Sequence, residues 1–276
     1  MMSSPKVPAY FDYLIDAFNR GEAGRHVHLG YWEHPKKADE DFASAQARLD
    51  ERVLAMAGLD SAQAVLDVGC GFGGTIAGLN GRLRDAWLAG VNVDGRQLAL
   101  CRQIAPANGN RIEWQEADAS RLPFAAGSFD RVICIEAMFH FPSRRAFFAE
   151  AARVLKPGGR LVGSDITLEA SAREIRVPGF AIEAPLRDGY GPWPDFWGDD
   201  ADHARLAKAA GLRKAKIEDI TDNTFPSHRF TAPRDADEGR DNGNPAWRAA
   251  VMLRWLHQKG HLRYTLFRFD KPAAAK

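Results

Sequence analysis

Val65-Leu66-Asp67-Val68-Gly69-Cys70-Gly71-Phe72-Gly73-Gly74-Thr75 is the stretch of sequence that decides the fold. A short apolar run with one acidic residue leads into four glycines within six residues. This pattern predicts a buried parallel strand that passes through a tight turn into a helix. Glycine suits such a turn because it adopts backbone angles that other residues avoid and lets a ligand approach the backbone closely. We therefore expect a nucleotide-like cofactor to lie on this turn.

The spacing Gly69-x-Gly71-x-x-Gly74 fits the fingerprint of dinucleotide-binding folds, which hold a pyrophosphate at a helix N-terminus. Asp67 argues for a different ligand, because a carboxylate two residues before the first glycine would repel a pyrophosphate. The same carboxylate would attract a cationic or amine-bearing ligand. S-adenosylmethionine, with its sulfonium and its amino group, meets that requirement better than NAD.

The composition is that of a globular protein without a global preference for a charged partner. The 276 residues suit one enlarged domain or a domain with a cap, and 37 Lys and Arg balance 36 Asp and Glu. This balance argues against nucleic acid and against an anionic membrane as partners. No apolar run is long enough to span a membrane, and the N-terminus lacks the apolar core of a signal peptide. The three cysteines have no metal-site spacing, so we expect reduced, packed thiols in a cytoplasmic protein.

Strands and helices alternate from residue 63 onward, which predicts a mostly parallel sheet with helices on both faces. The strands are expected at 63–68, 87–93, 112–116, 130–135, 160–166, 213–220 and 261–269. The helices are expected at 75–83, 95–103, 144–155, 201–210 and 245–258. Pro157-Gly158-Gly159 is expected to separate the helix at 144–155 from the fifth strand.

Residues 46–167 resemble the class I S-adenosylmethionine-dependent methyltransferases. The glycine turn is followed, in the family's order, by Gly90-Val91-Asn92-Val93, Glu116-Ala117-Asp118-Ala119, Leu122-Pro123-Phe124 with Ser128-Phe129-Asp130, and Arg153-Val154-Leu155-Lys156-Pro157-Gly158-Gly159. The resemblance implies a Rossmann-like α/β fold with a seven-stranded, mostly parallel sheet whose last strand is antiparallel. It divides the chain into an N-terminal helical lid (1–45), a cofactor-binding core (46–167), an acceptor-pocket insertion after the fifth strand (168–200) and the C-terminal part of the core (201–276).

Three stretches resemble bacterial methyltransferases that act on small molecules of natural-product type. They are His26-Val27-His28-Leu29-Gly30-Tyr31-Trp32, Gly90-Val91-Asn92-Val93 and Glu136-Ala137-Met138-Phe139-His140-Phe141. Such enzymes methylate oxygen, nitrogen or carbon. The resemblance therefore implies a small-molecule acceptor and leaves open the methylated atom, and the sequence also leaves open whether the protein is a monomer or a homodimer.

The resemblance implies which residues hold S-adenosylmethionine. They are Asp67, Gly69, Gly71, Gly74, Asn92, Gln97, Asp118 and Ala119, with Tyr31 and Trp32 near the sulfonium. Asp67 is expected to orient the amino group, and Asp118 to accept from the adenine amino group. Asn92 stands where the family often has an acid that binds both ribose hydroxyls, so Gln97 is expected to assist it. Asp94 is the rival for that role, or else the cap of the following helix.

The N-terminal segment carries apolar side chains at helical spacing. They are Tyr10, Phe11, Tyr13, Leu14 and Phe18. They form either a packing face or a lid that closes over cofactor and acceptor and excludes water. An aromatic face attracts a sulfonium as it attracts an ammonium, which favours the lid for the Gly30–Trp32 stretch.

His26 and His28 in the same segment raise the question of a metal ion. No Cys or Asp follows them at the spacing of a metal site. The sequence therefore predicts no metal.

Candidate catalytic residues are expected past the carboxyl ends of the fourth and fifth strands, where open α/β sheets bind ligands. They are Glu136, His140 and Asp165. The unperturbed pKa of histidine lies near neutrality, so His140 suits the base that removes the acceptor's proton. In similar sugar O-methyltransferases a histidine and an aspartate at these positions act at the acceptor hydroxyl, which makes Asp165 the orienting acid. The alternative is that His140 packs in a hydrophobic cluster and Asp165 caps a strand end.

Aromatic side chains are expected to form the acceptor pocket. Phe139 follows the fourth strand, and Phe180, Trp193 and Trp197 lie in the insertion. Aromatic rings on a pliable loop can enclose an apolar or ring-shaped molecule. The alternative is a hydrophobic cluster under a long loop.

Three functions remain open at this point. The first is methyl transfer by direct displacement to a hydroxyl or amine, with His140 and Asp165 assisting deprotonation. The second is C-methylation of an isoprenoid-like alkene or an activated ring, with Glu136 and aromatic rings stabilising a cation. The third is a non-catalytic cofactor-binding protein. Nucleic-acid methylation is disfavoured because Glu136-Ala137-Met138-Phe139 stands where an Asn/Asp-Pro-Pro-aromatic motif would be needed.

Overall fold

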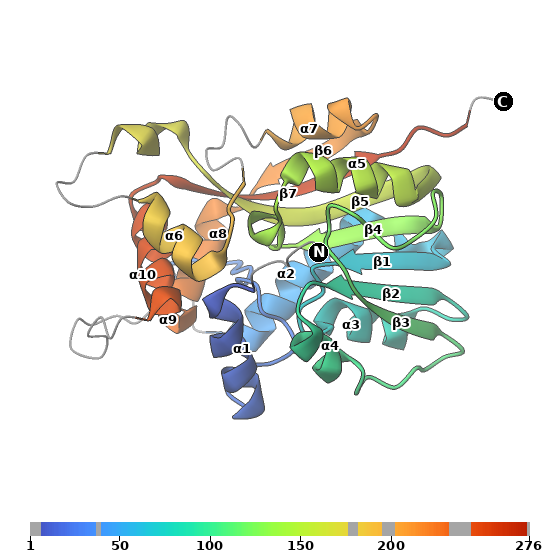
Figure 1. The fold of residues 1–276 in the computed structure, drawn as a ribbon, viewed down its shortest axis with the longest axis horizontal. Helices are drawn as coiled ribbons and strands as arrows, with labels where there is room; N and C mark the ends of the chain where they lie inside the picture. Colours follow the sequence, from blue (N-terminus) through green and yellow to red (C-terminus); the bar gives the residue numbers. More distant parts are fainter. Residues whose placement is uncertain (1–6, 37–39, 176–181, 195–201, 232–243, 275–276) are drawn as a thin grey trace, which may run out of the picture.

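The computed structural model describes residues 7–36, 40–175, 182–194, 202–231 and 244–274, which form a single seven-stranded sheet of order β3-β2-β1-β4-β5-β7-β6 (Figure 1). The strands are β1 (Ala64–Val68), β2 (Trp87–Asn92), β3 (Arg111–Glu116), β4 (Phe129–Ile135), β5 (Leu155–Leu168), β6 (Arg213–Asp219) and β7 (Leu262–Asp270). The pairs among β1 to β5 are parallel, and β7 lies antiparallel between β5 and β6. The predicted fold, including the antiparallel last strand, is confirmed.

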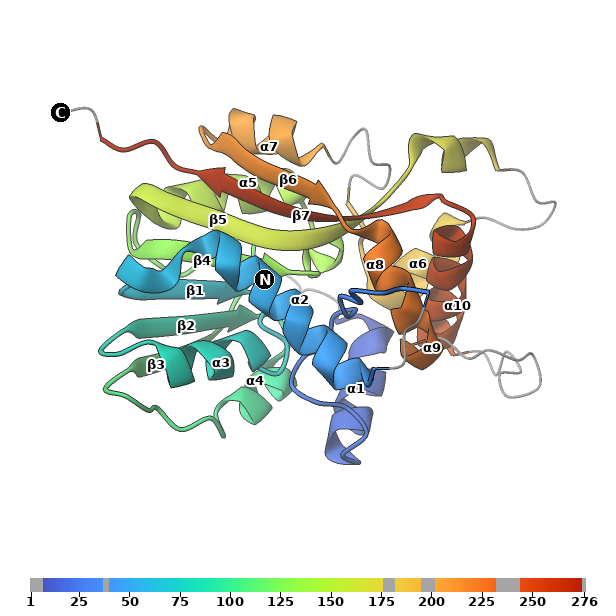
Figure 2. The same cartoon turned by 180° about the vertical axis from the view of Figure 1, so that it is seen from behind.

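The sheet has a hydrophobic core on each face, and neighbouring residues of a strand enter different cores. Val65 of β1 packs in the core under α2 and α3, whereas Leu66 packs in the core under α5 and α7. These helices are α2 (Phe42–Ala57), α3 (Gly74–Arg82), α5 (Arg144–Val154) and α7 (His203–Ala209). Figure 1 shows α5 and α7 in front of the sheet, and Figure 2 shows α2 and α3 in front. Because both faces are covered, every residue of β1 is buried.

Another group of helices gathers beyond the carboxyl ends of the parallel strands (Figures 1 and 2). The remaining helices of the described chain are α1 (Ala9–Asn19), α4 (Gly95–Cys101), α6 (Glu183–Tyr190), α8 (Thr221–Thr224), α9 (His228–Thr231) and α10 (Pro245–Gln258). α6 lies against α10 at such close range that a Cβ added to Gly189 would come within 2.3 Å of the Ala249 Cβ. α1, α6 and α10 therefore form a layer at the end of the sheet where a ligand is expected.

β5 is longer than expected at both ends. Pro157-Gly158-Gly159 lies inside the strand, and the pairing with β4 shifts register between Phe129 and Arg131. Gly158 has φ +80° and donates its N–H to the Lys271 carbonyl at 3.1 Å. The turn-forming residues thus produce an irregularity within the strand instead of a loop before it. At its other end β5 continues to Leu168, beyond the expected end at residue 166.

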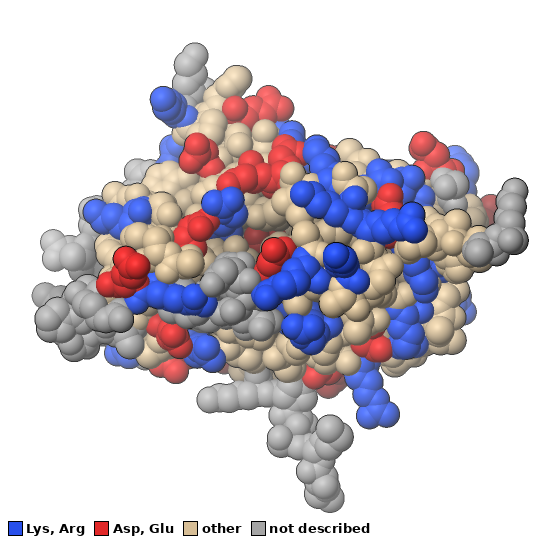
Figure 3. All heavy atoms as spheres, turned by 90° about the horizontal axis from the view of Figure 1, so that it is seen from above, with Lys and Arg blue, Asp and Glu red and all other residues tan. Residues whose placement is uncertain are grey.

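The surface agrees with the near-neutral composition. Figure 3 shows Lys and Arg side chains interspersed with Asp and Glu on the face seen from above. Among the described residues, no helix combines the length and the apolar character needed to span a bilayer.

Candidate active site

A cavity of about 780 Å³ opens at the carboxyl ends of β1, β2 and β4. One part is lined by the glycine turn and the ends of β2 and β3, and the other by α1, the loop after β4 and the end of α6. The residues predicted from sequence that line it are Gly69, Gly71, Asn92, Gln97, Asp118, Ala119, Glu136, Phe139 and His140. We call the first part the cofactor half and the second the acceptor half. The structure therefore brings six of the ten predicted cofactor contacts and two of the three predicted catalytic residues into one space.

The glycine turn has the backbone shape that its sequence requires. Gly69 and Gly71 have φ +77° and +51°, and a Cβ added to them would come within 2.4 Å of Ala137 Cβ and 2.9 Å of Val27 Cγ2. A Cβ on Gly74 would instead come within 2.8 Å of His26 Nδ1. Gly69 and Gly71 line the cavity, whereas Gly74 permits the close approach of the N-terminal segment.

Asp67 is a buried acid with no compensating partner among the described residues. It is 3% exposed, and no hydrogen-bond donor contacts it in the part of the chain that the structure describes. Burial, and to a lesser extent the nearby Asp50, raise the pKa of Asp67 to about 8. Asp67 directly precedes Val68 and Gly69, which line the cavity. A carboxylate in this state suits the amino group of S-adenosylmethionine, so the residues present fit the cofactor.

Asn92 and Gln97 form a pair at the end of β2. Asn92 Nδ2 donates to Gln97 Oε1 at 2.8 Å, and Asn92 Oδ1 accepts from the Val93 N–H at 2.7 Å. Gln97 Nε2 is buried and has no partner within the described chain. Because both residues line the cavity, this free donor fits a ribose hydroxyl. Asp94 caps α4 by accepting from the Arg96 N–H at 2.9 Å.

Asp118 both shapes its loop and faces the cavity. Its Oδ1 accepts from the Ser120 N–H at 2.7 Å, as the turn-capping alternative requires. Asp118 also lines the cavity together with Ala117 and Ala119. The position of Asp118 is therefore compatible with the predicted contact to the adenine amino group.

Glu136 directly follows β4 and has a left-handed backbone conformation, with φ +50°. Its Oε2 accepts from the Leu29 N–H at 2.8 Å and from the Tyr264 hydroxyl at 2.6 Å. Burial raises the pKa of Glu136 to about 8, although both donors act in the opposite direction. An unusual backbone angle at a cavity-lining acid is the kind of local strain that gathers at functional sites. Sequence reasoning found Glu136 but not its partner Tyr264, which is distant in the chain.

His140 lies in the acceptor half with a defined tautomer. Its Nδ1 is 2.5 Å from the Tyr190 carbonyl oxygen, which can only accept, so Nδ1 carries the hydrogen. Nε2 therefore holds a lone pair. Burial lowers the pKa of His140 to about 4, which keeps the ring neutral near pH 7. The centroid of the His140 ring lies 4.2 Å from that of the Phe139 ring and 5.1 Å from that of the Phe11 ring.

Asp165 does not reach this cavity. It lies within β5 and is fully buried, and its Oδ2 accepts from Arg144 Nε at 2.7 Å and His203 Nε2 at 2.9 Å. Burial alone would raise its pKa, but Arg144 and His203 hold the pKa below its usual value. The predicted pairing of His140 with Asp165 is absent, because β5 extends three residues beyond Asp165 and so places this side chain inside the sheet and not at a strand end. Arg144 and His203 were not identified from the sequence, since their only signal is spatial.

Tyr31 and Trp32 also lie outside the cavity. Trp32 is 1% exposed, donates from Nε1 to Ser227 Oγ at 3.0 Å and stacks on Phe230. The Tyr31 ring lies under the Arg52 guanidinium, 4.2 Å away. The cavity is covered instead by the helical face predicted further upstream, through Tyr10, Phe11 and Leu14 of α1.

The aromatic residues of the insertion contribute in different ways. Trp193 is fully buried and stacks on Phe139 at 4.7 Å, so it supports a cavity-lining ring from behind. Phe180 and Trp197 lie outside the described residues. Arg187 and Asp188 near the end of α6 also line the cavity.

Comparisons connect the chain to known proteins. A family model described as "Methyltransferase domain" matches residues 66–163. The methyltransferase GfsG of Streptomyces halstedii is 32% identical over 261 residues, which cover 88% of each chain. The O-methyltransferase cnsE of Penicillium expansum is 30% identical over 88% of this chain and 85% of its own length.

A solved structure shares the fold. It is the geranyl diphosphate C-methyltransferase of Streptomyces coelicolor A3(2), in complex with Mg²⁺, geranyl diphosphate and S-adenosyl-L-homocysteine. The TM-score is 0.70 at 17% identity, covering 97% of this chain and 99% of the other. At that identity the likeness concerns the fold alone.

Proposed function

Because the chain belongs to the class I S-adenosylmethionine-dependent small-molecule methyltransferases, we propose that it methylates a hydroxyl oxygen of a secondary metabolite. The observation that carries the proposal is the single cavity in which the glycine turn and His140 meet. The name of the relative from Penicillium expansum, an O-methyltransferase, supports oxygen as the methylated atom. The aromatic lining of the acceptor half supports an apolar or ring-containing acceptor.

The cofactor half would position the donor. Bound S-adenosylmethionine supplies an electrophilic methyl group. Asp67 would hold the amino group by charge, while Asn92 and Gln97 would bind the ribose hydroxyls. The glycine turn gives the backbone room for the methionine part. Tyr10 and Phe11 of α1 would cover the bound ligands and exclude water.

The acceptor half would position and deprotonate the hydroxyl. His140 Nε2 holds the lone pair that accepts the proton, and the Tyr190 carbonyl oxygen stabilises the resulting imidazolium through Nδ1–H. The low pKa of the free ring keeps that lone pair available near neutrality. Because the ring is then a weak base, proton removal would accompany methyl transfer. Glu136, held by Leu29 and Tyr264, would contact the acceptor from the end of β4.

C-methylation is the second candidate function. It is favoured by the placement of the Glu136 carboxyl group in the same cavity as the rings of Tyr10, Phe11 and Phe139, which together could stabilise a cation. Deprotonation would then follow methyl transfer. The C-methyltransferase with the same fold makes this alternative worth testing.

The experiment uses cofactor with an isotope-labelled methyl group. The enzyme is incubated with extract of the producing cells, and mass spectrometry identifies the molecule that gains the label. A labelled product whose methyl resonates as a methoxy group in NMR supports the proposal, whereas a methyl group on carbon supports the second candidate. We further propose that the enzyme acts in the cytoplasm, which the three buried, unbridged cysteines support.

A further inference from the structure

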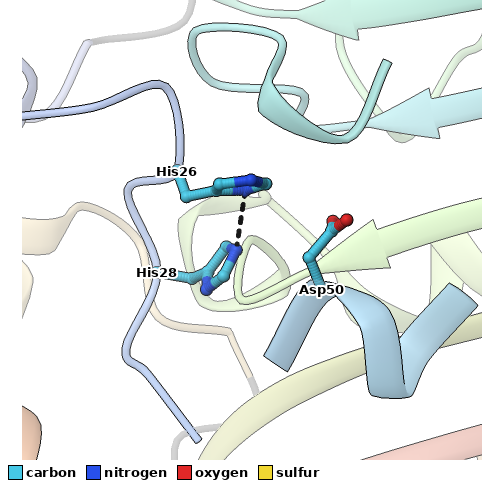
Figure 4. A group of neighbouring side chains, drawn as sticks. All are labelled: His26, His28 and Asp50. Carbon is cyan, nitrogen blue, oxygen red and sulfur yellow. Dashed lines mark hydrogen bonds between the residues drawn. The ribbon is translucent and has the colours of Figure 1, made fainter. Parts of the chain in front are cut away.

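His26, His28 and Asp50 converge beside the glycine turn (Figure 4). The two histidines precede α2, and Asp50 lies on α2. One nitrogen of each histidine and one carboxylate oxygen of Asp50 lie within 4.8 Å of one another. Within the described ranges, no other group of three or more His, Cys, Asp or Glu residues has this geometry. The sequence argument against a metal considered only spacing along the chain, so it did not include Asp50 of α2.

The two imidazoles face each other with nitrogens that can bind an ion. His28 Nδ1 donates to the Leu29 carbonyl oxygen at 2.8 Å, which leaves a lone pair on Nε2. That Nε2 is 3.3 Å from His26 Nδ1. A backbone carbonyl on the far nitrogen is the usual arrangement around a metal-binding histidine, because it fixes the tautomer and the ring orientation.

Neighbouring groups hold the Asp50 side chain and the backbone of both histidines in place. Thr75 Oγ1 donates to Asp50 Oδ1 at 2.6 Å. Gln46 Nε2 donates to the carbonyl oxygens of both His26 and His28, at 2.9 and 2.7 Å. His28 and Asp50 are buried and His26 is half-buried, so an ion could enter from the His26 side. The cluster is therefore built before any ion arrives.

We propose that His26, His28 and Asp50 bind one divalent transition-metal ion, with Zn²⁺ the best match. Two imidazole nitrogens and one carboxylate oxygen suit Zn²⁺, whereas Mg²⁺ and Ca²⁺ prefer oxygen ligands throughout. Three protein ligands leave a fourth position for water. The site is separate from the methyl-transfer chemistry assigned to His140.

The ion would fasten the N-terminal segment to α2 at the edge of the cofactor half. Val27 and His28 line the cavity, and His26 Nδ1 approaches the Gly74 position closely. An ion that binds only the folded protein stabilises it by mass action. We therefore expect bound Zn²⁺ to raise the melting temperature and to tighten the binding of S-adenosylhomocysteine.

The test compares chelator-stripped wild type with His26→Ala and Asp50→Asn. Asp50→Asn keeps the shape of the side chain, and His34→Ala removes an exposed histidine nearby as the matched control. Each protein is titrated with Zn²⁺ against a chromophoric chelator, and its metal content is measured after dialysis. Circular dichroism of the metal-free proteins checks that each variant is folded.

We expect wild type and His34→Ala to retain one Zn²⁺ per chain. His26→Ala and Asp50→Asn should weaken binding by more than about a hundredfold, because changes to outer groups alone cost roughly 10–100-fold. Zn²⁺ should raise the melting temperature of wild type but not of Asp50→Asn. The proposal is overturned if folded His26→Ala and Asp50→Asn bind Zn²⁺ as tightly as wild type, or if wild type retains none.

Discussion

The two halves of the cavity are built from different parts of the chain. The cofactor half comes from the carboxyl ends of adjacent strands and from backbone shape, as in Gly69 and Gly71. The acceptor half comes from α1, the loop after β4 and α6, which are far apart in sequence. Residues of the first half work largely through their local motif. Those of the second depend on tertiary partners, such as the Tyr190 carbonyl that fixes the tautomer of His140.

The largest effect is expected in the cofactor half. Gly71→Leu should abolish measurable binding of S-adenosylhomocysteine by calorimetry, because a side chain at φ +51° is strained and would overlap Val27. Gly78→Leu is the matched control, since a Cβ there meets open space. Wild-type affinity in Gly71→Leu would remove the turn from the cofactor site.

A change in the acceptor half should leave the cofactor half intact. His140→Ala should lower turnover by about 10²–10⁴-fold while the affinity for S-adenosylhomocysteine stays near wild type. Rapid-quench measurement of methyl transfer checks the first result and calorimetry the second, with His34→Ala as control. If turnover stays normal, His140 has no part in catalysis.

Asp67 allows a pH test of the cofactor half. Asp67→Asn should weaken cofactor binding by about ten- to a hundredfold, the usual range for a lost charged hydrogen bond. Because the pKa of free Asp67 is about 8, binding of a cation near pH 7 should expel a proton from this carboxyl group. Calorimetry in buffers of different ionisation enthalpy measures that proton release.

The release should be present in wild type and in the exposed-residue control Asp60→Asn, and reduced by one proton's worth in Asp67→Asn. Equal release from all three proteins would show that Asp67 does not respond to the cofactor.

The titration of Glu136 should have a smaller effect, on the pH dependence of the protein's stability. Burial raises the pKa of Glu136 from its ordinary value of 4.5 to about 8, so the folded state binds more protons than the unfolded state over this interval. By linkage, this group lowers the free energy of unfolding as pH rises from about 4.5 to 8. Glu136→Gln removes this titration. The melting temperature of the variant should therefore lie about a few degrees above that of wild type at pH 8.5, but not at pH 4. A difference that does not change with pH would contradict this account.

The smallest effect is expected outside the cavity. Tyr31→Phe should change cofactor affinity by less than about twofold, because the ring lies under Arg52 and not against the cavity. A tenfold loss would instead restore the sequence-based prediction that Tyr31 contacts the cofactor.

The same division explains what the sequence could predict. The glycine turn, Asn92 with Gln97, and Asp118 follow strands whose period and spacing are visible locally, and all reach the cavity. The alternation of strands and helices predicted the parallel part of the sheet, whereas the antiparallel last strand was implied by the family resemblance. The prediction that Asp165 faces the cavity is wrong. β5 ends two residues later than expected, and Asp165 therefore lies inside the sheet in a buried ion pair with Arg144.

Partners from distant elements left no local signal in the sequence. Tyr264 on β7 reaches Glu136 only through the inserted antiparallel strand, and Asp50 reaches His26 and His28 only through the packing of α2. A pattern read over a few residues predicts neither contact. The periodicity of the sequence predicts helices and strands, whereas side-chain contacts between distant elements can be found only in the assembled fold.

The central claim is that the two halves cooperate in methyl transfer to oxygen through His140. The most direct measurement is NMR of the product formed from cofactor with a ¹³C-labelled methyl group, by wild type and by His140→Ala in parallel. The account predicts a labelled methoxy group from wild type and a yield at least about a hundredfold lower from the variant at matched cofactor saturation. A labelled methyl group on carbon, formed equally by both proteins, would contradict it.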